Sequence, residues 1–101
     1  MGEGLPYALA RTSGILSPAA GLKRTVAETL KEQFWVTTSG YFTRPPFECA
    51  RAVLGLDRLM YSVDYPFSPN TRGADFLKSL QLNAEEEAAI RGGIAAGLLK
   101  L

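Results

Sequence analysis

The chain has 101 residues, of which 47% are hydrophobic and 21% charged, and this size and apolar content suit one small globular unit. Eleven basic residues against ten acidic ones leave a net charge of +1, which gives no preference for nucleic acid. The apolar runs are too short to span a membrane and the N-terminus has no signal-peptide pattern, so we do not expect a membrane protein. A single cysteine suits a reducing compartment, and we therefore expect a cytoplasmic protein.

Histidine is absent from the sequence, and Cys49 is the single cysteine. The lack of histidine excludes, within these residues, catalytic arrangements with a histidine base and metal sites that need imidazole. One cysteine excludes an internal disulfide, and we expect Cys49 to be a buried helix residue. These residues by themselves therefore do not supply a complete catalytic set of the usual kinds.

Two helices and a strand are predicted in the first forty residues. Residues 5–16 predict a short helix that ends at Ser13-Gly14, and residues 17–21 predict a loop. Residues 22–34 predict an amphipathic helix, because apolar residues recur at every fourth position with charges between them: Leu22, Val26, Leu30 and Phe34. The β-branched and aromatic residues of 34–39 predict the first strand.

A helix and a second strand follow. Thr43 is a candidate N-cap for a helix over residues 46–55, and Gly55 suits the C-cap of that helix. Residues 57–63 predict a short strand that is apolar enough to be buried on both faces. The order helix–strand–helix–strand indicates a right-handed parallel βαβ unit, with strands at Trp35–Thr38 and Leu59–Val63.

The last third of the chain is predicted to be helical. Residues 68–80 predict a loop followed by a helix, and residues 83–101 predict another helix. Asn83 with Glu86 three residues later is a capping-box pattern, and Gly92-Gly93 is expected to break or bend this helix. The fold class is therefore α/β.

Two parallel strands do not complete a domain. Parallel sheets need helices on both faces and neighbours along both edges, and here backbone groups are expected to be unpaired on both edges. We interpret the chain as a piece of a larger parallel structure. A polypeptide of these residues alone is expected to self-associate, or to need the rest of that structure for solubility.

The stretch LMYSVDYPF places Asp64 where the second predicted strand ends. Carboxylates at the ends of barrel strands are frequently catalytic. The alternative is a structural role, because Asp also forms turns and caps the helix that follows.

Three motifs together resemble one enzyme family: FWVTTSGYF, LGLDRLMYSVDYPF and the terminal GLLKL. They resemble the C-terminal third of the amidohydrolase-related metal-dependent decarboxylases, the group of aminocarboxymuconate-semialdehyde, dihydroxybenzoate and resorcylate decarboxylases. The resemblance covers essentially all of residues 1–101. It implies a single partial domain, which is the last two parallel strands and flanking helices of a (β/α)8 TIM barrel and is incomplete as a barrel. It also implies that the earlier strands, which carry the family's histidines, lie outside this sequence.

The resemblance implies roles for four residues. Asp64 matches a catalytic aspartate that is also a ligand of the divalent metal. Glu3 matches a glutamate that orients the proton-transferring histidine, with a solvated residue beside the N-terminus as its alternative. Phe67 matches an aromatic residue that lines the substrate pocket, with core packing as its alternative. Arg11 matches an arginine that reaches into the neighbouring subunit's site to hold a substrate carboxylate, with a solvated helix residue as its alternative.

The activity implied by the resemblance is loss of carbon dioxide from an aromatic or enoic acid with a zinc or manganese ion. These metals are not distinguished, because Asp64 suits both. Hydrolysis on the same scaffold is an alternative, since a fold does not determine a reaction. A further alternative is a non-catalytic interaction remnant. In either case the 101 residues alone are expected to be inactive and to bind the metal weakly, because one carboxylate is too few ligands. The expected partners are a carboxylic acid, the rest of the barrel and other copies of the chain.

Overall fold

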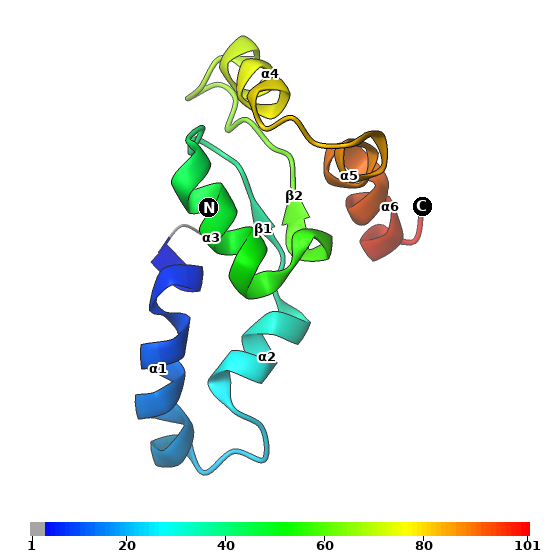
Figure 1. Ribbon diagram of the computed structural model, residues 1–101. Coiled ribbons are helices and arrows are strands. Elements are labelled where there is room, and N and C mark those ends of the chain that lie inside the picture. Colours follow the sequence, from blue (N-terminus) through cyan, green and yellow to red (C-terminus); the bar gives the residue numbers. More distant parts are fainter. Residues whose placement is uncertain (1–3) are drawn as a thin grey trace.

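A two-stranded parallel sheet lies between helices in the computed structural model, which describes residues 4–101 (Figure 1). Strand β1 (Val36–Thr37) pairs with β2 (Leu59–Met60), with Val36 opposite Leu59. Helix α3 (Arg44–Leu54) and the short 3₁₀ turn η1 (Leu56–Arg58) connect the two strands. The predicted parallel βαβ unit is confirmed, although each strand is shorter than its sequence pattern.

Helices α1 (Gly4–Ala20) and α2 (Val26–Gln33) form a hairpin that extends below the sheet in Figure 1. The prediction that the first helix ends at Ser13-Gly14 is wrong, because α1 continues through Pro18. The hydroxyl of Ser13 accepts a hydrogen bond from the Ala27 N–H at 3.0 Å, and that of Ser17 accepts from the Val26 N–H at 2.9 Å. The serines therefore cap the next helix instead of ending their own.

The start of α2 also differs from the prediction. The helix begins at Val26, whereas Leu22 lies before it and is 60% exposed. Thr25 and Glu28 form a capping box: the Thr25 hydroxyl accepts from the Glu28 N–H, and a Glu28 carboxylate oxygen accepts from the Thr25 N–H. This local hydrogen bonding sets the helix start more strongly than the apolar spacing does.

Helix α3 begins after Thr43, which lies at the N-cap position but makes no side-chain capping bond. The predicted cap is wrong because Pro45 and Pro46 occupy the first turn and have no N–H to donate. The predicted C-cap is confirmed: Gly55 has a φ of 94°, and its N–H donates to the Arg51 carbonyl at 3.0 Å.

Of the C-terminal helices, α4 (Asn70–Ser79) lies beyond the carboxyl end of β2, and the later helices lie on the other side of β2 from β1 (Figure 1). These later helices comprise α5 (Ala84–Ala88), a π-helical segment η2 (Ala89–Gly93) and α6 (Ile94–Leu99). The Asn83–Glu86 capping box is confirmed, and the predicted bend at Gly92-Gly93 falls in the π-helical segment.

The expectation that both sheet edges are unpaired is partly wrong. The Tyr61 N–H donates to the Ile90 carbonyl of η2 at 2.9 Å, so a helix supplies an acceptor at the outer edge of β2. A single apolar core joins these elements, with Ile90 and Leu77 the most deeply buried large side chains. The core contains Leu9, Val36, Phe47, Ala50, Leu54, Leu59, Phe76, Leu77, Leu80 and Ile90.

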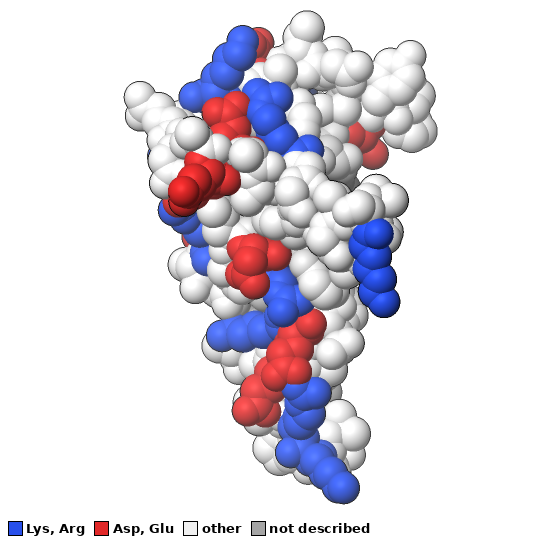
Figure 2. Space-filling model, turned by 90° about the vertical axis from the view of Figure 1, so that its right-hand side faces the viewer, with Lys and Arg blue, Asp and Glu red and all other residues white. Residues whose placement is uncertain are grey.

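Charges of both signs are mixed on the face of the molecule in Figure 2. Basic and acidic side chains alternate toward the lower end of that view, where Figure 1 places α2. This face has no single-sign patch of the kind that attracts nucleic acid. Within residues 4–101, no helix combines the length and the apolar character that crossing a bilayer requires.

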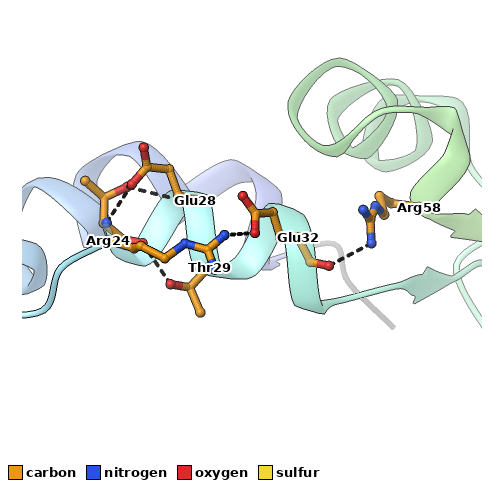
Figure 3. A network of polar contacts seen from close by, with 6 residues as sticks. Arg24, Glu28, Thr29, Glu32 and Arg58 are labelled. Atoms are coloured by element: carbon orange, nitrogen blue, oxygen red, sulfur yellow. Dashed lines mark hydrogen bonds and ion pairs between the residues drawn. The ribbon is translucent and has the colours of Figure 1, made fainter.

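A polar network joins α2 to Arg58 (Figure 3). Arg24, which precedes α2, forms an ion pair with Glu32 near the end of that helix. Arg58, just before β2, donates to the Glu32 carbonyl at 2.9 Å, and its guanidinium lies 4.4 Å from the centroid of the Trp35 ring. Arg58, beside the start of β2, therefore contacts both the end of α2 and Trp35, the residue before β1.

The capping box makes stability depend on pH at this helix. The hydrogen bonds from the Thr25 backbone and hydroxyl lower the pKa of Glu28 from its ordinary 4.5. Since the folded-state pKa is lowered, the stabilisation is present above pH 4.5 and is lost as pH falls through the folded pKa. We expect Thr25→Ala to cost about 1 kcal/mol at pH 7 and less at pH 3, measured by urea unfolding with circular dichroism.

Glu28→Gln is the control for this prediction. The amide oxygen of the substituted side chain can still accept from the Thr25 N–H, but the amide does not titrate. The cost of Thr25→Ala in the Glu28→Gln background should therefore be the same at both pH values. A cost that still falls at low pH in that background would show that another group is responsible.

Candidate functional site

Asp64 lies after the carboxyl end of β2, at the same edge of the sheet as the end of β1. Its φ of 66° is in the left-handed region, which Asp tolerates better than most residues, and its carbonyl accepts from the Ser68 N–H at 3.0 Å. The carboxylate is exposed and makes no hydrogen bond or ion pair with any residue from 4 to 101. It does not cap α4, which has Pro69 at its N-cap position and no side-chain capping bond.

The residues leading to Asp64 alternate between two environments. Leu59 belongs to the core, and the side chains of Tyr61 and Val63 approach Gly73 of α4. Successive side chains of an extended segment point to opposite faces. Met60 and Ser62 therefore face away from α4 and the core. They are only half-buried. This second face, which leads to Asp64, is the face that lines the interior when such strands close into a barrel.

Phe67 lies in the turn that follows Asp64 and is 86% exposed. Phe67 therefore does not belong to the core formed by residues 4–101. Tyr65 in the same turn is also largely exposed. The structure thus keeps an aromatic side chain three residues from the candidate carboxylate and free to contact a ligand.

Arg11 lies on α1, exposed, and forms no hydrogen bond or ion pair within the described residues. Helix α1 packs on α2 and α3 and lies well apart from the loop between β2 and α4 (Figure 1). One chain therefore does not bring Arg11 to Asp64. Glu3 lies outside the described residues, and Cys49, predicted to be buried, is half-buried.

Sequence reasoning missed Thr38, which follows β1 and is 8% exposed. Its hydroxyl contacts the backbone of Ser62, two residues before Asp64. The signal was a hydroxyl residue at the end of a strand, directly before the Ser39-Gly40 turn. Such a side chain is able to replace a backbone hydrogen-bond partner where the ladder stops.

The described part of the chain holds no cluster of three or more His, Cys, Asp or Glu side chains able to bind a metal ion. Asp64 contributes one hard anionic ligand, the type that divalent cations such as Mn²⁺ accept. A metal site at this edge therefore needs ligands in addition to those that residues 4–101 supply.

Comparison with known proteins gives a consistent set of relatives. The sequence model of the Amidohydrolase family matches residues 7–101. The γ-resorcylate decarboxylase of Polaromonas sp. is 32% identical over 106 aligned residues, which cover 100% of this chain and 32% of that protein. Decarboxylase orsB of Emericella nidulans is 39% identical over 84 residues, 80% of this chain and 25% of that protein.

Solved structures of decarboxylases share the fold of the chain. The 5-carboxyvanillate decarboxylase of Sphingomonas paucimobilis superposes with a TM-score of 0.89 at 26% identity, over 99% of this chain and 32% of that one. The dihydroxybenzoic acid decarboxylase of Polaromonas sp., solved with manganese and the inhibitor 2-nitroresorcinol, gives 0.85 at 30% identity, over 99% and 32%. The chain thus spans about a quarter to a third of the length of these relatives.

Proposed function

Because the chain belongs to the amidohydrolase family, we propose that it forms the C-terminal part of a metal-dependent decarboxylase that releases carbon dioxide from an aromatic acid. Residues 1–101 are one partial domain, and β1 and β2 are the last two strands of a (β/α)8 barrel. The observation that carries this proposal is the position of Asp64. Its carboxylate, which has no partner among residues 4–101, follows β2 in a chain that superposes over 99% of its length on a decarboxylase.

The metal is a divalent cation, manganese or zinc, held in part by Asp64. The carboxylate fits this task because it is exposed and has no partner among residues 4–101, so its oxygen lone pairs are available. When bound, the metal ion polarises substrate oxygens and stabilises the charge that develops on them. The remaining ligands come from other strands of the complete barrel.

Loss of carbon dioxide requires a proton at the ring carbon from which the carboxylate departs. Asp64 holds and orients an imidazole supplied by another strand, and this pair moves the proton. Glu3 orients the same imidazole. Phe67 covers the aromatic ring of the substrate and excludes water from the reacting carbon.

Arg11 acts in the site of a neighbouring copy of the chain, because α1 lies apart from Asp64 within one copy. A guanidinium binds a substrate carboxylate through two parallel hydrogen bonds, which orients the bond that breaks. The enzyme is therefore a homo-oligomer. Its place is the cytoplasm, where the single cysteine stays reduced.

A fusion protein tests this proposal. The first two thirds or so of the Polaromonas γ-resorcylate decarboxylase would be joined to this chain in place of its own aligned third. We expect this chimera to bind Mn²⁺ and to release carbon dioxide from γ-resorcylate, whereas the 101-residue chain alone does neither at a measurable level. A folded chimera that binds Mn²⁺ but turns over no aromatic acid would refute the decarboxylase proposal. Hydrolysis of an ester or amide by the same chimera would support the hydrolase alternative instead.

A further inference from the structure

The backbone ladder between the two strands ends before it reaches Asp64. Its last bond is from the Thr38 N–H to the Met60 carbonyl, at 3.1 Å. In a regular parallel pair, the Thr38 carbonyl would next accept from the Ser62 N–H. Here the chain turns at Ser39-Gly40, where Gly40 has a φ of 72°, and the Thr38 carbonyl accepts from the Tyr41 N–H at 3.0 Å instead.

The Thr38 side chain replaces the missing ladder bonds. Its hydroxyl donates to the Ser62 carbonyl at 2.7 Å and accepts from the Ser62 N–H at 3.1 Å. One hydroxyl thus pairs both backbone groups of Ser62, which would otherwise lose their partners on the β1 side. Since Thr38 is 8% exposed, water competes little for these bonds.

The opposite edge of the same segment is held by a different element. The Tyr61 N–H donates to the Ile90 carbonyl of the π-helical segment at 2.9 Å. The segment between β2 and Asp64 is therefore hydrogen-bonded on both sides. The Thr38 side chain bonds Ser62 on one side, and the Ile90 carbonyl bonds Tyr61 on the other. Asp64 lies two residues after Ser62 and has a left-handed backbone conformation with a φ of 66°.

From this geometry we propose that Thr38 is a positioning residue, whose hydroxyl fixes the segment ending in Asp64 so that the Asp64 carboxylate meets the metal ion. This inference rests on the proposed function. A metal ligand must be held within a few tenths of an ångström of its position, and its own side chain has no partner within residues 4–101 to hold it. Backbone restraint through Ser62 supplies the order that the side chain lacks.

Two variants of Thr38 separate its hydroxyl from its shape. Thr38→Val keeps the volume and the β-branch but removes both hydrogen bonds, whereas Thr38→Ser keeps the hydroxyl. Thr29→Val is the matched control, because the Thr29 hydroxyl also donates to a backbone carbonyl, that of Thr25 at 3.0 Å, but lies in α2. Both Val variants thus lose one threonine hydroxyl that donates to a backbone carbonyl.

The first measurement is amide hydrogen exchange over residues 60–67 in the chimera. We expect Thr38→Val to raise the exchange rate of this segment about tenfold, Thr38→Ser to restore most of the protection, and Thr29→Val to leave it unchanged. Equal exchange in the two Val variants would overturn the inference.

The second measurement is the Mn²⁺ dissociation constant of the chimera, by calorimetry. We expect Thr38→Val to weaken Mn²⁺ binding about 10- to 100-fold, with rescue by Thr38→Ser. Faster exchange without weaker Mn²⁺ binding would overturn the inference, because Thr38 would then serve the fold alone. A chimera that binds no Mn²⁺ would also overturn it, whereas one that binds Mn²⁺ without turnover refutes only the decarboxylase reaction and leaves Thr38 to be judged by affinity.

Discussion

Replacement of Asp64 by alanine in the chimera is expected to abolish stoichiometric Mn²⁺ binding and to lower kcat/KM about a thousandfold or more. Without the Asp64 ligand, the metal ion binds less tightly and is not held against the substrate oxygens. Its interaction with those oxygens stabilises the transition state by roughly several kcal/mol. The fold should survive, because the Asp64 side chain is exposed and has no partner in the described part of the chain. Metal content and steady-state kinetics are the measurements, with circular dichroism to verify folding.

Asp57→Asn is the matched control for Asp64. Asp57 is also an exposed aspartate, but it lies at the opposite end of β2, where its carboxylate is 3.5 Å from Arg58. An exposed ion pair of this kind contributes about 0–1 kcal/mol, so we expect metal content and kcat/KM to change little. Equal losses of metal content and kcat/KM in Asp57→Asn and Asp64→Ala would mean that the negative charge of the protein as a whole supports activity, and not a metal ligand at the end of a strand.

Gly73→Ala is expected to destabilise the chain by about 1–3 kcal/mol, although alanine favours helix over glycine. A Cβ at this position in α4 would lie 2.4 Å from Cγ1 of Val63 and 3.0 Å from the Tyr61 hydroxyl. Valine is stiff about its first side-chain torsion, so relief requires α4 to move away from the segment before Asp64. The free energy of unfolding in urea measures this cost.

Gly14→Ala is the control for Gly73→Ala. Gly14 is also within a helix, α1, but a Cβ there meets no atom within 4 Å. We therefore expect Gly14→Ala to stabilise the chain by about 0.5–1 kcal/mol. Adding Val63→Ala to Gly73→Ala should recover part of the loss, since it removes the clashing Cγ1. A Gly73→Ala variant as stable as Gly14→Ala would show that α4 does not pack closely on this segment.

Much of the fold follows from local patterns in the sequence. The Asn83–Glu86 capping box and the Gly55 C-cap were predicted correctly, because each depends on residues within four positions of one another. The parallel pairing of β1 and β2 was also predicted, since a helix between two short apolar strands permits few arrangements. The motifs around Asp64 predicted the family, which the comparisons confirm.

The tertiary structure alone decided the hydrogen bonds between residues that lie far apart in the sequence. Ser13 looked like the end of a helix, but its hydroxyl bonds the Ala27 N–H fourteen residues away, and α1 continues. Thr38 looked like an ordinary strand residue, but its hydroxyl bonds Ser62, twenty-four residues away. A hydroxyl is short and bonds whichever backbone group the fold places within about 3 Å, so its partner is set by packing and not by neighbouring residues.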